Sequence, residues 1–122
     1  MNATFDGIEG HLAELESVWE AGMHEAYAFY RSRAEPAVAL AAAMVESAAS
    51  LQELGHRPPA PPHLLLGDLC LARASRLLAS TRDQRLQVGF ARAVEHVAAA
   101  AAGGPPAPPL RTLLVAAIGE AG

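Results

Sequence analysis

The spacing of apolar residues between Leu64 and Thr81 constrains the fold more than any other feature of this sequence. Apolar side chains recur there mostly at intervals of three and four, namely at Leu66, Leu69, Cys70, Leu77 and Leu78. This interval places side chains on one face of an α-helix that packs against a core. Asp68 and Arg73 adjoin the stripe, and unpaired polar groups are costly to bury. We therefore expect both side chains to be at least partly buried and hydrogen-bonded, in a helix at the centre of the bundle or of a dimer interface.

The same interval recurs elsewhere in the chain and predicts four more helices: Phe5–Tyr30, Pro36–Leu54, a helix from Arg82 to the glycines at 103–104, and Leu110–Ile118. Pro36 suits the first turn of its helix, where a missing N–H is not needed. Thr81 and Gln84 have the spacing of a capping box, which predicts that the following helix begins at Arg82.

Two proline-rich stretches, at residues 55–62 and 103–109, connect the predicted helices, because proline prevents a helix from continuing. Residues 119–122 are expected to fray. Hydrophobic residues make up 52% of the chain but aromatic residues only 5%, and much of the first figure is alanine. Alanine buries little area, so the helices must pack closely. We predict an all-α fold with one domain over residues 1–122, a bundle of about five helices with proline-rich connections.

Charge and hydropathy exclude some functions. A net charge of −4 provides no basic surface for nucleic acid. The N-terminus lacks the basic and apolar regions of a signal peptide, and the alanine runs at 41–43 and 98–102 are too short to span a membrane. We expect a cytoplasmic protein without membrane insertion. Cys70 is the only cysteine, and its place in an apolar helix indicates a buried free thiol.

No phosphate-binding loop, catalytic triad or His/Cys cluster can be assembled from the sequence. Glu46 is the only charge in its predicted helix before Glu53. We interpret it as marking the solvent side of that helix, whereas an inward-facing Glu46 would need a partner such as Arg73 or Arg76. Glu53 and His56 are three positions apart, a spacing that metal sites use, but no third ligand is close in the sequence.

Three segments carry a resemblance to a known family: RSRAEPAVALAAA (31–43), AAMVESAASLQELGHRP (42–58) and LLLGDLCLARASRLLAST (64–81). In this order they resemble the N-terminal part of the trans-type polyprenyl diphosphate synthases, an all-helical family that elongates allylic diphosphates with isopentenyl diphosphate. The Gly-Asp pair followed by the LARA helix is the most specific match. The resemblance implies an isoprenoid-synthase-like fragment in which five matched positions are retained structural residues: Arg33, Pro36, Gly67, Asp68 and Arg73.

The sequence departs from this family at the positions that bind diphosphate and metal. Glu35 stands where the family has an arginine, and its charge would repel a diphosphate. Gln52 and Glu53 stand where the first aspartate-rich motif begins, and one carboxylate cannot replace the cluster that binds Mg²⁺. The family's second aspartate-rich motif is not reached. The resemblance therefore implies no catalytic, cofactor-binding or metal-binding residue in this chain, with Mg²⁺ held only by a catalytic partner.

Three hypotheses follow from these observations. The chain resembles the small, non-catalytic subunit of a heterodimeric bacterial polyprenyl diphosphate synthase, whose partner is a large catalytic subunit. Alternatively, it is a stand-alone helical protein that forms a homodimer with another copy of itself. In the third hypothesis it is an enzyme whose metal or acid–base site is formed by Glu46, Glu53, His56, Asp68 and His96.

Overall fold

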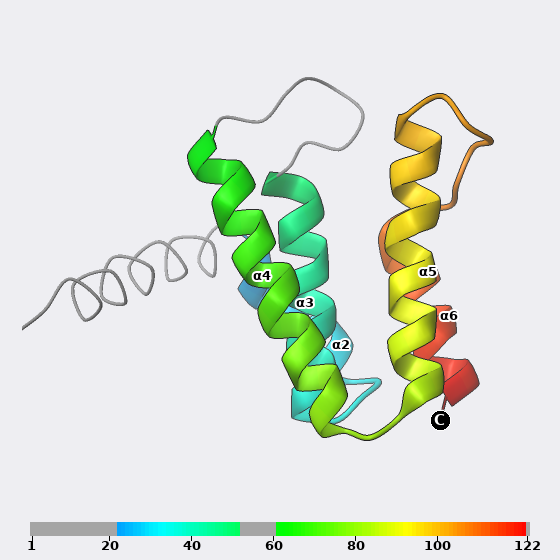
Figure 1. Cartoon of the computed structure of the whole chain (residues 1–122). Helices are drawn as coiled ribbons and strands as arrows, with labels where there is room; N and C mark the ends of the chain where they lie inside the picture. Colours follow the sequence, from blue (N-terminus) through cyan, green and yellow to red (C-terminus); the bar gives the residue numbers. More distant parts are fainter. Residues whose placement is uncertain (1–21, 52–60, 122) are drawn as a thin grey trace, which may run out of the picture.

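The computed structural model describes residues 22–51 and 61–121, and all secondary structure within those ranges is helical. The helices are α2 (His24–Arg31), α3 (Pro36–Leu51), α4 (Pro61–Ser80), α5 (Gln84–Ala101) and α6 (Leu110–Ala121). In Figure 1, α2, α3 and α4 form one group, and α5 with α6 forms a second, antiparallel pair. The prediction of an all-α bundle is confirmed.

Several helix ends agree with the sequence pattern. α3 begins at Pro36, and α5 ends at Ala101, just before the two glycines. Gly103 there has a φ of +98°, and the N–H of Gly104 donates to the carbonyl oxygen of Ala99 at 2.9 Å. This left-handed glycine and the bond behind it form a common helix stop. The predicted first helix is described only in its last part, from His24 onward, and the predicted end of the second helix at Leu54 lies outside the described residues.

Other helix ends differ from the prediction. α4 begins at Pro61, three residues before Leu64. α6 continues to Ala121, three residues beyond its predicted end at Ile118. α5 begins at Gln84, with Asp83 as its N-cap, rather than at Arg82.

Competition between two polar residues explains the start of α5. The hydroxyl of Thr81 donates to the carbonyl oxygen of Leu78 at 2.6 Å, so Thr81 closes α4. The carboxylate of Asp83 accepts the N–H of Leu86 at 3.1 Å, as an N-cap does. Arg82 lies between them with a φ of +58°. Asp83 therefore takes the cap position that the sequence pattern assigned to Thr81.

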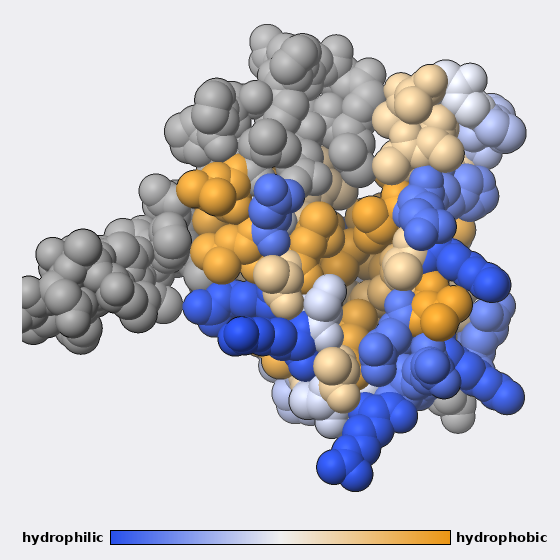
Figure 2. Space-filling view, in the orientation of Figure 1, coloured by the Kyte–Doolittle hydropathy of each residue, from blue (hydrophilic) through white to orange (hydrophobic). Residues whose placement is uncertain are grey.

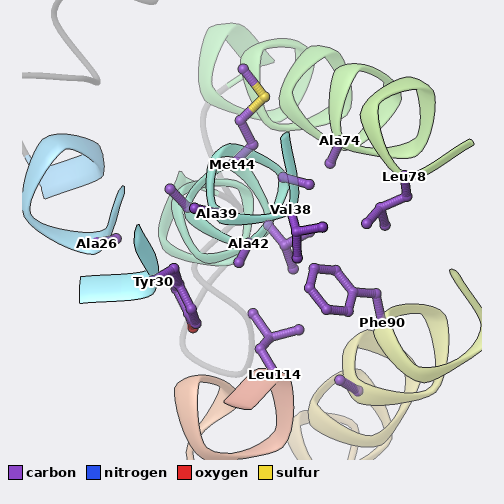
Figure 3. Close-up of a cluster of buried hydrophobic side chains, with 14 of the residues drawn as sticks. Ala26, Tyr30, Val38, Ala39, Ala42, Met44, Ala74, Leu78, Phe90 and Leu114 are labelled. Atoms are coloured by element: carbon purple, nitrogen blue, oxygen red, sulfur yellow. The ribbon is translucent and has the colours of Figure 1, made fainter. Parts of the chain in front are cut away.

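α3 is the central helix of the described structure. Nine of its sixteen residues are buried, most of them alanine or valine. Because these side chains are small, neighbouring helices approach α3 closely: α2 lies on one side, α4 on another, and the α5–α6 pair meets the remaining side (Figure 3). The Leu64–Thr81 helix is therefore not the centre of the bundle, because α4 packs against α3 with one face and exposes its arginines on the other; its alternative place at a dimer interface stays a prediction.

The core fills the space between these helices. Figure 3 shows Val38 and Ala42 of α3 facing Leu78, Phe90 and Leu114. Between α5 and α6 the approach is close: a Cβ atom at Gly89 would lie 2.9 Å from the Cβ of Ala117. The described structure thus has the tightly packed, small-residue core that its alanine content predicts.

Candidate functional site

The most extensive polar network in the described structure centres on Arg111, near the start of α6. Its Nε donates to Glu46 Oε2 at 2.9 Å and its Nη2 to Glu46 Oε1 at 3.0 Å. The same guanidinium donates from Nη1 and Nη2 to the two carboxylate oxygens of Glu25, at 3.1 and 2.9 Å. Such two-pronged bonds match the planar shapes of both groups. One arginine therefore joins α2, α3 and α6, and we call Arg111, Glu25, Glu46 and Tyr30 the clamp.

Tyr30 is the fourth member of the clamp. It is fully buried, and its hydroxyl donates to the Oε2 of Glu46. Phe29 meets Tyr30 edge to face, with ring centroids 5.1 Å apart. Arg111 lies over the Phe29 ring at 4.4 Å from its centroid, and Arg33 lies over the same ring at 4.1 Å. The aromatic pair thus supports the arginine that the two carboxylates hold.

Three groups of the clamp have shifted pKa values. Burial, reinforced by the bond to Glu46, raises the pKa of Tyr30 far above its ordinary value. The hydrogen bonds to Glu25 and then to Glu46 raise the pKa of Arg111 further. The hydrogen bonds from Arg111 lower the pKa of Glu25. Tyr30 therefore stays protonated and Arg111 charged, so the clamp joins helices and is not arranged to transfer protons.

Glu46 corrects one of the sequence interpretations. Its side chain is only 21% exposed, and its partners are Tyr30 and Arg111; Arg73 and Arg76, the partners considered for an inward-facing Glu46, are exposed on α4. A signal for this pair was present in the sequence. Glu46 and Arg111 are each an isolated charge on an otherwise apolar helix face, and such lone opposite charges are candidates for pairing.

The five positions that match the polyprenyl synthase motifs lie in two places. Arg33 and Pro36 are exposed at the turn between α2 and α3, and the Nη1 of Arg33 donates to the carbonyl oxygen of Phe29 at 3.2 Å. The other three positions, Gly67, Asp68 and Arg73, lie on α4. Of these three, only Gly67 is buried. The expectation that Asp68 and Arg73 are partly buried is wrong, because both lie on the side of α4 that points away from α3.

The structure describes only part of the hypothetical enzyme site. Glu46, Asp68 and His96 lie on three different helices, and Glu53 and His56 lie outside the described residues. Within residues 22–51 and 61–121, no group of three or more His, Cys, Asp or Glu side chains is arranged to hold a metal ion. Cys70 is fully buried, and burial raises the pKa of its thiol, which confirms the buried free thiol.

Two grooves open on the second half of the described chain. The first lies between α4 and α5, has a volume of about 420 Å³ and is mainly apolar; we call it the α4–α5 groove. Figure 2 shows apolar surface in this position, between flanks of polar side chains. The second groove, of about 680 Å³, lies between α5 and α6; Arg85, Arg92 and His96 line it on α5, and Glu120 lines it on α6.

A third feature is the edge of α4 that faces away from α5. Leu66, Cys70, Ala74 and Leu78, spaced by four, bury one face of α4. A parallel strip consists of Leu65, Leu69, Arg73 and Arg76, which we call the outer flank of α4. Leu65 is 64% exposed, Leu69 is half-buried, and both arginines are exposed. This flank therefore presents aliphatic side chains beside cationic ones.

Fold and site together define a small α-helical bundle that is braced by the clamp and leaves apolar surface open along α4 and α5. Comparisons with protein-family models, with curated proteins and with solved structures find no match. A membrane span would need a long apolar helix, and the described residues contain none that qualifies.

Proposed function

We propose that this chain is a non-catalytic helical subunit that acts by binding another protein, and that its partner is the catalytic subunit of a polyprenyl diphosphate synthase. The observation that carries the proposal is the outer flank of α4. It belongs to the Leu64–Thr81 segment, which has the most specific resemblance to that family. Leucines bordered by arginines are a suitable composition for a protein interface, whose centre is apolar and which is enriched in arginine.

The clamp supports a binding role. Its charged groups are engaged with one another across three helices, and the pKa directions of Tyr30, Arg111 and Glu25 keep their protonation states fixed at neutral pH. A polar network of this kind stabilises the bundle that presents α4. In this proposal the metal and the diphosphates are bound by the catalytic partner.

Co-purification tests the proposal. The chain should bind a long polyprenyl synthase of its own organism and change the rate or product length of that enzyme. Leu65→Glu places a charge on the outer flank and should abolish binding, whereas Ala99→Glu, at an exposed position of α5 outside both grooves, should leave it intact. If no synthase is captured, and adding the chain changes neither rate nor product length, the proposal fails.

A second candidate function is a stand-alone homodimer. The α4–α5 groove favours it, because an apolar groove of this size on a small bundle is a natural site for a helix. Size-exclusion chromatography with light scattering, on the chain alone, tests this candidate. A dimer supports it, and a monomer at high concentration contradicts it.

A further inference from the structure

We propose that the α4–α5 groove binds residues 1–21 of a second copy of this chain, so that two copies exchange their N-terminal segments. The inference rests on the homodimer candidate and specifies which segment and which surface form the contact. It does not involve the outer flank of α4, and it is therefore independent of the polyprenyl synthase partner.

The α4–α5 groove has the form of a helix-binding site. Val45 of α3 lies at its base, Leu71 and Leu78 of α4 form one wall, and Phe90 and Val94 of α5 form the other. A separate small space of about 10 Å³ lies next to it, lined by Val45 and Ala48 of α3, Leu71 of α4 and Val94 of α5. α4 and α5 are joined at one end by residues 81–83 and are well separated along most of their length (Figure 1). The groove is therefore mainly apolar and open to solvent.

The N-terminal segment has the matching pattern. Ile8, Leu12, Leu15 and Trp19 are spaced by four, three and four positions. A helix that binds in an apolar groove inserts anchors at these intervals. Aromatic residues are scarce in this chain, and its single tryptophan is one of these four residues.

Charge adds to the fit. Residues 1–21 contain five acidic residues and no lysine or arginine: Asp6, Glu9, Glu14, Glu16 and Glu20. Residues 65–101, which include the described side chains of α4 and α5, carry five exposed arginines, Arg73, Arg76, Arg82, Arg85 and Arg92, against three acidic residues, Asp68, Asp83 and Glu95. None of these arginines lines the α4–α5 groove itself, so the opposite net charges promote the encounter of two copies at long range and do not form contacts within the groove.

Geometry favours a second copy over the same chain. Gly22 and Met23 line a pocket together with Ser50 and Leu51, so the first described residues lie beside the end of α3. α2 lies on the opposite side of α3 from Leu78 and Phe90 (Figure 3). The four residues from Trp19 to Met23 span at most about 14 Å, and α3, about 10 Å wide, lies between α2 and the groove (Figure 3). Placing Trp19 in the groove of its own chain would therefore need a nearly fully extended connection around α3, whereas a second copy has no such limit.

Matched variants of the full chain test the proposal by light scattering and by the fluorescence of Trp19. The wild type should have twice the mass of one chain, and its Trp19 emission should shift to the blue as the dimer forms. Leu15→Glu in the segment and Ala91→Glu in the groove should each raise the dimer dissociation constant at least about tenfold, because each opposes a charge to apolar surface. Ser17→Glu, off the apolar stripe, and Ala99→Glu, outside the groove, should leave it unchanged.

Folding does not confound this test, because Ala91 is exposed and circular dichroism reports the helix content of each variant. A mixture of the Leu15→Glu and Ala91→Glu chains combines an intact groove with an intact segment, so it should form dimers at concentrations where each variant alone is monomeric. A dimer that is insensitive to both variants leaves the homodimer candidate standing and overturns the exchange. A wild type that stays monomeric overturns both the homodimer candidate and the exchange. A Trp19 emission that is already blue-shifted in the monomer, before the dimer forms, overturns the exchange alone.

Discussion

Replacing Arg111 by methionine tests the clamp most directly. The change removes the charge that pairs with Glu46 and Glu25 but keeps an unbranched apolar chain over Phe29. Breaking a buried ion pair costs about 3–5 kcal/mol, and an exposed pair contributes about 0–1 kcal/mol. The side chains of Arg111 and Glu46 are 31% and 21% exposed, between those limits. We therefore expect Arg111→Met to lower the free energy of unfolding by about 2 kcal/mol.

For a domain of this length, a loss of about 2 kcal/mol lowers Tm by about 8 °C. Urea unfolding followed by circular dichroism measures the change in free energy, and Arg85→Met provides the control, because Arg85 is an exposed arginine of α5 that should change stability by less than about 0.5 kcal/mol. If Arg111→Met is no more destabilising than Arg85→Met, the clamp does not hold the helices together and the argument is wrong.

Two further predictions concern pH and packing. Arg111 lowers the pKa of Glu25 in the folded state, so the Glu25 carboxylate stabilises the fold above the ordinary glutamate pKa of 4.5, and this stabilisation is lost as the pH falls through the lowered pKa. In urea titrations at a series of pH values, Glu25→Gln should remove this acid-dependent loss of stability. An unchanged loss of stability at acid pH would contradict the assignment. Gly89→Ala places a methyl group 2.9 Å from the Cβ of Ala117 and should destabilise the protein by about 1 kcal/mol despite the better helix propensity of alanine. Gly119→Ala is the control: it has open space around it and should stabilise the protein by up to about 1 kcal/mol. Equal effects of the two substitutions on thermal unfolding would exclude a close approach of α5 and α6.

Much of the fold was predictable because it depends on local patterns. Apolar spacing predicted the helices, Pro36 marked the start of α3, and the two glycines marked the end of α5. The start of α5 was not predictable in the same way. Thr81 and Asp83 are both good capping residues, and the choice between them depends on the hydroxyl of Thr81 binding the end of α4.

The site was less predictable, because its members are distant in the sequence. Glu46 and Arg111 are 65 positions apart, and periodicity within one helix contains no information about which helix lies opposite. The position of α3 at the centre was missed for a related reason. A leucine-rich helix has the stronger apolar pattern, but a helix of small residues can be approached from several sides, and this decided the centre of the bundle.

A centre made of alanine and valine creates a problem that the clamp solves. Similar small side chains repeat along α3, so sliding a neighbouring helix by one turn exchanges one set of alanine contacts for a nearly equal set. The two-pronged bond between Glu46 and Arg111 has one geometry only, and it therefore fixes the register of α6 against α3. Replacing both residues by methionine separates this role from stability. The double variant should regain part of the stability that Arg111→Met loses, because no partly buried carboxylate is left without its arginine, although the buried hydroxyl of Tyr30 loses its acceptor. It should also unfold with a weaker dependence on urea if the register is no longer unique. An unchanged urea dependence would show that apolar packing alone sets the register.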